Sequence, residues 1–157
     1  MSDEINYRFA REDDFPIIMK FYVYLNKYYQ QTGFLLPSPE NVSQLWMDSF
    51  VRTLGRFSIL IVAEVKDQVV GFILARIKRS PPYMGGVLVG ELSDMWVVEE
   101  YRKTGIGKQL IVLGLEWVKE QKVHSVEVQI PVGIDASWRI CESLGFVMDY
   151  RHGRLML

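Results

Sequence analysis

A short basic, glycine-rich stretch holds the residues best placed to do chemistry. The segment "VVEEYRKTGIGKQL", residues 97–110, brings Arg102, Lys103, Gly105 and Gly107 together where a strand pattern gives way to a helix pattern. The first turn of a helix presents unpaired backbone N–H groups and about half a positive charge. Glycines let an anion approach those groups without a Cβ in the way. The stretch therefore predicts a site for a small anion such as a phosphate.

Two common phosphate motifs do not fit this stretch. A P-loop needs G-x-x-x-x-G-K-[ST], but Arg102 stands five residues before Gly107, and Gln109 replaces the hydroxyl residue after Lys108. A dinucleotide fingerprint needs a small residue where Leu110 stands. It also belongs to the first strand–helix unit of its fold, whereas this stretch follows several predicted strands. A charged helix start without any ligand remains the plain structural alternative.

The composition describes the body that carries this stretch. The 157 residues suit one domain spanning 1–157, and 49% hydrophobic and 24% charged residues are ordinary globular levels. The net charge of −1 gives no broad basic field, so neither nucleic acid nor an anionic membrane is an expected partner. The lone Cys141 and two distant histidines have no metal-ligand spacing, so no metal is expected.

The sequence carries no pattern of an export signal or a membrane span. Its first ten residues, "MSDEINYRFA", are acidic and lack an apolar core. No apolar run approaches the roughly 20 residues that cross a bilayer. We therefore expect a cytoplasmic protein.

Hydrophobic periodicity predicts the elements that position the basic stretch. A strand at residues 5–10 precedes a helix that starts near Phe15, and a second helix has Ser38 as its N-cap and stops at Gly55. Later strands are predicted over 57–65, 69–78, 87–98 and 125–132. Two later helices are predicted, one from 105 to 122 and one from an Asp135 N-cap to Gly145. Residues 146–157 are predicted to form two closing strands.

The predicted order is β-α-α-β-β-β-α-β-α-β-β, which indicates an α/β fold of the mixed α+β kind. We expect a mixed central sheet of six to seven strands, with four helices covering both of its faces.

The motif R-x-x-G-x-G at 102–107 follows a strand and opens an amphipathic helix. In this setting it resembles the coenzyme A pyrophosphate loop of the GNAT superfamily of N-acetyltransferases. Val97 and Arg102 match the V-x-P-x-x-R approach of that family, with Glu99 in place of proline, and "SWRICESLGF" (137–146) loosely matches its A-x-x-L-Y-x-x-x-G-F segment. The order of elements also agrees, so the resemblance covers nearly the whole chain.

The resemblance implies that acetyl-CoA is the co-substrate and that backbone N–H groups of the loop hold its pyrophosphate. It also implies that a backbone N–H near Val97 or Val98 meets the oxyanion of the reaction. The residues expected to bind acetyl-CoA are Val97, Val98, Arg102, Lys103, Thr104, Gly105, Ile106, Gly107 and Lys108.

The implied reaction transfers an acetyl group to a primary amine by direct attack. An alkyl ammonium with a pKa near about 10.4 must lose a proton, which costs about 4 kcal/mol at neutral pH, so a base is expected. Strand 87–98 offers Glu91, our first choice, and Asp94. Regular alternation puts them on opposite faces of the sheet, and a bulge would break that parity. Either carboxylate could instead be solvated or ion-paired.

The family's tyrosine acid is replaced here by Cys141, and Ile134 stands where the family carries an asparagine. Cys141 is therefore the candidate for the leaving-group acid, although a single cysteine on an apolar helix face also suits core packing. These departures keep open an alternative, a catalytically weak or inactive acyl-CoA-binding or regulatory module. A nucleotide-binding protein that transfers no acyl group is a weaker alternative.

The acceptor is expected to be a small-molecule or peptide amine. Several aromatic residues of the first helix region could form its wall, and tyrosine faces attract ammonium groups: Tyr22, Tyr24, Tyr28, Tyr29 and Phe34. Core and surface packing is the alternative explanation for each of them. Similar proteins pair through sheet edges or C-terminal strands, so a homodimer is a further expectation from the resemblance.

Overall fold

The computed structural model describes residues 3–157 and contains one five-stranded sheet and four α-helices. The strands are β1 (Ile5–Phe9), β2 (Ser58–Val65), β3 (Gln68–Arg79), β4 (Leu88–Val97) and β5 (Ser125–Val128). The helices are α1 (Phe15–Gln31), α2 (Val42–Asp48), α3 (Ile106–Glu120) and α4 (Asp135–Ser143).

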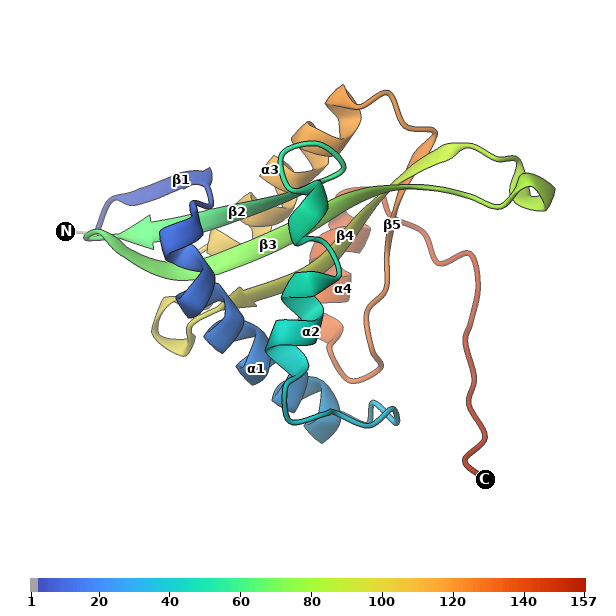
Figure 1. Ribbon diagram of the computed structural model, residues 1–157, viewed down its shortest axis with the longest axis horizontal. Helices are drawn as coiled ribbons and strands as arrows, with labels where there is room; N and C mark the ends of the chain where they lie inside the picture. Colours follow the sequence, from blue (N-terminus) through green and yellow to red (C-terminus); the bar gives the residue numbers. More distant parts are fainter. Residues whose placement is uncertain (1–2) are drawn as a thin grey trace.

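The sheet has the strand order β1-β2-β3-β4-β5 and is covered on both faces. Neighbouring strands from β1 to β4 are antiparallel, and β5 joins β4 in parallel through the α3 crossover. On β2, Ile59 and Ile61 pack in the core with α3, whereas Leu60 and Val62 pack in the core with α1 and α2. This alternation places α1 and α2 on one face, and α3 and α4 on the other (Figure 1).

Strand β4 contains a bulge at the point where its carboxylates lie. Leu74 of β3 pairs with Asp94, but the next residue of β3 pairs with Leu92, so Ser93 is the extra residue. Leu92 packs in the core with α3. The bulge therefore turns both Glu91 and Asp94 to the face of α1 and α2, so the strand follows the bulged alternative and not regular alternation.

Strands β4 and β5 separate after a short paired stretch. Their pairing ends at Leu92 and Val128, whereas β4 continues to Val97. The edge of β4 beyond Leu92 is thus left open toward the segment that follows β5. This separation creates room between the two halves of the sheet.

Three predictions about the fold are wrong in detail. The sheet has five strands instead of six to seven, because residues 146–157 form no strand and leave the body as an extended tail (Figure 1). Helix α2 begins at Val42 with Asn41 as its N-cap, since the Ser38 hydroxyl donates to the Asn26 side chain. Asp135 is the first residue of α4, and its N-cap is Ile134.

Candidate active site

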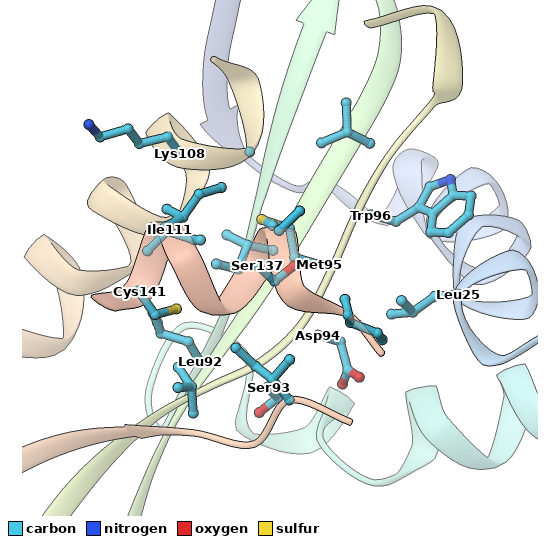
Figure 2. A pocket seen from close by; sticks show the side chains of 18 of the residues that line it. Leu25, Leu92, Ser93, Asp94, Met95, Trp96, Lys108, Ile111, Ser137 and Cys141 are labelled. Carbon is cyan, nitrogen blue, oxygen red and sulfur yellow. The ribbon is translucent and has the colours of Figure 1, made fainter. Parts of the chain in front are cut away.

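A cavity of about 420 Å³ lies where β4 and β5 separate. Its walls come from β4, from the segment that follows β5, and from α1, α3 and α4 (Figure 2). At one end is the anion loop, which we define as residues 102–108, and Lys108 lies there. Asp94 lies away from it, on the side of α1 and α2.

The anion loop ends in an exposed start of α3. Gly105 is the N-cap with φ of 91°, and the first helical backbone bond is donated by Gln109 to the Gly105 carbonyl at 3.0 Å. The N–H groups of Ile106, Gly107 and Lys108 precede that bond and have no partner within the helix. Gly107 and Lys108 line the cavity, so these donors lie beside it.

The two glycines of the loop serve different purposes. Gly105 needs its left-handed φ, and Lys103 also has a positive φ of 62°. Gly107 has no such backbone need, and a Cβ added there would make only ordinary contact with Met95 Cε at 3.5 Å. Protein packing therefore does not demand glycine at 107, and the position instead leaves space for an approaching ligand.

Arg102 and Thr104 help to shape the loop. The Arg102 Nε donates to the Val97 carbonyl at 2.8 Å, and its guanidinium lies 4.5 Å from the ring centroid of Trp96. The Thr104 hydroxyl donates to the Tyr101 carbonyl. Both side chains fix the turn, whereas Lys103 and Lys108 have no ion pair within residues 3–157.

Asp94 is a cavity-lining carboxylate held by one directed hydrogen bond. The Trp46 Nε1–H of α2 donates to its Oδ2 at 2.9 Å. Burial raises the pKa of Asp94, the Trp46 hydrogen bond and the charge of Arg76 oppose that rise, and Glu91 adds to it. Asp94 is thus a stronger proton acceptor than an ordinary aspartate.

Glu91 has a different environment, outside the residues that line the cavity. Its carboxylate accepts from Lys78 Nζ at 2.8 Å and from the Ser93 hydroxyl at 2.7 Å. Burial tends to raise its pKa, but these two donors prevail and lower it. Lys78 also pairs with Glu127 of β5. Glu91 is therefore an ion-paired and weakly basic group.

Cys141 lines the cavity from α4 and is only 2% exposed (Figure 2). Burial raises the pKa of its thiol, so the group stays protonated at neutral pH. It packs in the same core as α3. Ile134, which replaces the family's asparagine, also lines the cavity.

The open edge of β4 supplies backbone groups beside the cavity. The Val98 N–H donates to the Val70 carbonyl at 2.9 Å, so it cannot meet an oxyanion, contrary to one of our expectations. Alternation along an antiparallel ladder then turns the N–H groups of Val97 and Met95 away from β3, toward this edge. Both residues line the cavity.

One wall of the cavity is apolar and largely aromatic. We call it the aromatic end, and it consists of Leu25, Tyr28 and Tyr29 of α1 and Trp96 of β4. Tyr28 meets the Trp96 ring edge-on with a centroid separation of 6.4 Å. Burial and the nearby Asp94 charge raise the pKa of Tyr29. Of the aromatic residues expected at this wall, Tyr28 and Tyr29 line the cavity, whereas Tyr22, Tyr24 and Phe34 do not.

Sequence reasoning missed Trp46 and Trp96. Trp46 lies on a short helix and is stacked on Tyr22, with ring centroids 4.2 Å apart. It is separated from Asp94 by 48 residues along the chain, so no local pattern connects them. Trp96 follows the bulge, and its position beside the cavity depends on that irregularity.

Residues 3–157 contain neither a metal-binding cluster nor a membrane-spanning helix. No group of three or more His, Cys, Asp and Glu residues in this range could hold a metal ion. Within the same range, none of the helices is both long and apolar enough to cross a bilayer.

Comparison with known proteins places this geometry in a family. Residues 20–146 match the model of the acetyltransferase (GNAT) family. A search of curated protein sequences gave no match.

Several solved structures share the fold. A protein from Bacillus halodurans has a TM-score of 0.79 at 19% identity, over 97% of this chain and 99% of that chain. A predicted acetyltransferase with acetyl-CoA from Clostridium acetobutylicum has a TM-score of 0.76 at 15% identity, over 98% of this chain and 96% of that chain. A ribosomal-protein-alanine N-acetyltransferase from Brucella melitensis has a TM-score of 0.71 at 16% identity, over 98% of this chain and 100% of that chain. The family match covers most of the chain, and these structures share its architecture; the protein therefore belongs to the GNAT family of acetyltransferases.

Proposed function

We propose that this protein transfers an acetyl group from acetyl-CoA to a primary amine by direct attack. The observation that carries the proposal is a single cavity that connects the anion loop with a carboxylate of raised pKa, Asp94. A phosphate-binding loop and a proton acceptor are the two features that this reaction needs from the chain.

The anion loop suits the pyrophosphate of acetyl-CoA, which supplies the activated acetyl thioester. The N–H groups of Ile106, Gly107 and Lys108 would donate to phosphate oxygens, and Lys103 and Lys108 would add positive charge. The absent Cβ at Gly107 fits this role, because the protein itself has no packing need for glycine there. Arg102 contributes by holding the turn against Val97 and Trp96.

The open edge of β4 suits the amide-containing arm that joins the pyrophosphate to the thioester. An extended chain can pair with unpaired backbone groups at a sheet edge. The N–H groups of Val97 and Met95 are the donors available there, and either could stabilise negative charge on a carbonyl oxygen. Val98 is excluded from that role by its bond to Val70.

We assign the role of proton acceptor to Asp94 in place of our first choice, Glu91. Asp94 lines the cavity, and burial raises its pKa. The raised pKa lies closer to the operating pH, where a general base is most effective. Glu91 is neutralised by Lys78 and does not line the cavity. The Trp46 N–H leaves one oxygen of Asp94 to take a proton from the amine, directly or through a water molecule.

Cys141 is a core residue in this account, because its thiol is buried and its pKa is raised. The departing thiolate, with a thiol pKa near about 8.5, can take its proton from water. The replacement of the family's tyrosine by Cys141 also favours a second candidate function, an acyl-CoA-binding module with little or no turnover.

One experiment separates the two candidates. Purified protein is mixed with acetyl-CoA and a panel of amines, and products are followed by free CoA release and by mass spectrometry. Acetylated amine above the uncatalysed rate supports the transferase. Tight acetyl-CoA binding without any acetylated product supports the binding module.

A further inference from the structure

The charges that line the cavity are three cations and one carboxylate, and one of the cations, Arg102, lies against the Trp96 ring. The cations, Arg102, Lys103 and Lys108, all belong to the anion loop. Among the described residues that line the cavity, Asp94 is the only acidic one. An acceptor that approaches Asp94 therefore meets one negative charge.

Glu91, the acidic group that acts on Asp94, is ion-paired. Glu91 and Glu127 both pair with Lys78. Arg76 of β3 adds a positive charge that acts on Asp94 and Glu91, and it is held by the Ser49 hydroxyl at 3.3 Å and by the ring of Phe50 at 5.3 Å. A second ammonium group on the acceptor would find no second carboxylate among the described residues that line the cavity.

The aromatic end offers contacts to a different kind of substituent. Leu25 is 4% exposed, and the rings of Tyr28, Tyr29 and Trp96 complete the wall. Aromatic faces attract an ammonium group and also pack well against another ring. The cavity of about 420 Å³ must also hold the thioester end of the co-substrate, so the space left for the acceptor is compact.

We propose that the acceptor is a small primary amine with one positive charge and an apolar, preferably aromatic, substituent. This inference rests on the proposed acetyl transfer and names its substrate class. The ammonium group lies at Asp94, and the substituent packs against the aromatic end. Polyamines and aminoglycosides are disfavoured as acceptors, because their further ammonium groups find no second carboxylate among the described residues of the cavity wall.

The test compares kcat/KM for phenethylamine, spermidine, kanamycin, glutamate and an alanine-initiated peptide at saturating acetyl-CoA. We expect phenethylamine to exceed each of the others by about 10²-fold, the scale of discrimination that a pocket reaches by apolar contacts. A higher value for any other member of the panel would overturn the substrate class and leave acetyl transfer in place. Acetyl-CoA binding without acetylation of any amine would instead overturn the proposed function.

A charge variant makes the test sharper. Tyr28→Glu adds a carboxylate at a cavity residue that is 39% exposed, so the fold tolerates the change. Val23→Glu is the matched control, because Val23 also lies on α1, is 41% exposed and does not line the cavity. We expect Tyr28→Glu to shift the phenethylamine-to-spermidine ratio about threefold to fivefold toward spermidine, the scale of one exposed charge pair, and the control to leave it nearly unchanged. Equal ratios in the two variants would contradict the placement of the acceptor.

Discussion

Replacing Asp94 by asparagine should weaken catalysis and strengthen the fold at the same time. Asparagine keeps the shape of the side chain, and its carbonyl oxygen can still accept the Trp46 Nε1–H, which donates to Asp94 at 2.9 Å. The change therefore removes the charge and the proton acceptor without removing the contact. Loss of a general base typically slows a reaction by about 10²-fold to 10⁴-fold, and we expect kcat/KM to fall by at least about 10²-fold.

The gain in stability follows from the direction of the pKa shift. Burial raises the folded-state pKa of Asp94 above its unfolded value, so the folded protein holds that proton more tightly. Its contribution to stability is greatest below the unfolded pKa and is lost as the pH rises through the folded pKa. A difference of one pH unit between the folded and unfolded pKa values would cost the ionised wild type about 1.4 kcal/mol at neutral pH. Asp94→Asn should recover this cost.

The assay pairs kinetics with urea unfolding at pH 7 and at acidic pH. We expect Asp94→Asn to unfold at higher urea than the wild type at pH 7, and the difference to shrink at acidic pH. Glu91→Gln serves as the comparison, since it breaks an ion pair with Lys78 and should keep most of the turnover. Full activity in Asp94→Asn, together with loss of activity in Glu91→Gln, would refute the assignment of the base.

Three other predictions concern residues around the site and the fold. Trp46→Phe removes the hydrogen bond that lowers the pKa of Asp94. The acidic limb of the pH profile of kcat/KM should therefore move to higher pH, and an unmoved limb would exclude Trp46 as a positioning residue. Cys141→Ala should keep most of the turnover, and a loss as large as that of a general acid would make the thiol catalytic. Arg8→Leu removes the bidentate partner of Asp14, which is 8% exposed, so urea unfolding should show a loss of about 3 kcal/mol. Because Arg8 lowers the pKa of Asp14, that loss should fade as acid protonates Asp14, and a loss that is unchanged at low pH would contradict the ion-pair account.

Local patterns predicted the elements that carry the anion loop. The β2–β3 hairpin, the β4 strand and the start of α3 near Gly105 all appear close to their expected places. These elements are set by alternation, by turn residues and by a helical stripe, and all three signals act over neighbouring residues. The order of the first nine elements could be predicted for the same reason.

The features that decide the chemistry depend on contacts between distant residues. The bulge at Ser93 adds one residue to β4 and turns Asp94 to the face of α2, which simple alternation cannot anticipate. Burial among these elements makes Asp94 the stronger base although the Trp46 hydrogen bond opposes the shift, and the Lys78–Glu91 ion pair makes Glu91 the weaker one.

The prediction of two closing strands was wrong for a related reason. Residues 146–157 contain apolar residues that suit strands, but a strand forms only where a partner edge receives it. In this structure six large apolar side chains of the segment are exposed: Val147, Met148, Tyr150, Leu155, Met156 and Leu157. Strand propensity alone does not say whether such pairing occurs.

The most direct test of the account is calorimetric titration with acetyl-CoA of the wild type, Gly107→Ala and Gly153→Ala. Gly107→Ala would place a methyl group among the loop N–H groups without straining the backbone, and Gly153→Ala is the matched control, with nothing within 4 Å of its added Cβ. We predict that the wild type and the control bind alike and that Gly107→Ala binds at least about tenfold more weakly, as expected when hydrogen bonds to a charged group are lost. Equal binding by all three proteins, or none by the folded wild type, would contradict the claim that this loop holds acetyl-CoA.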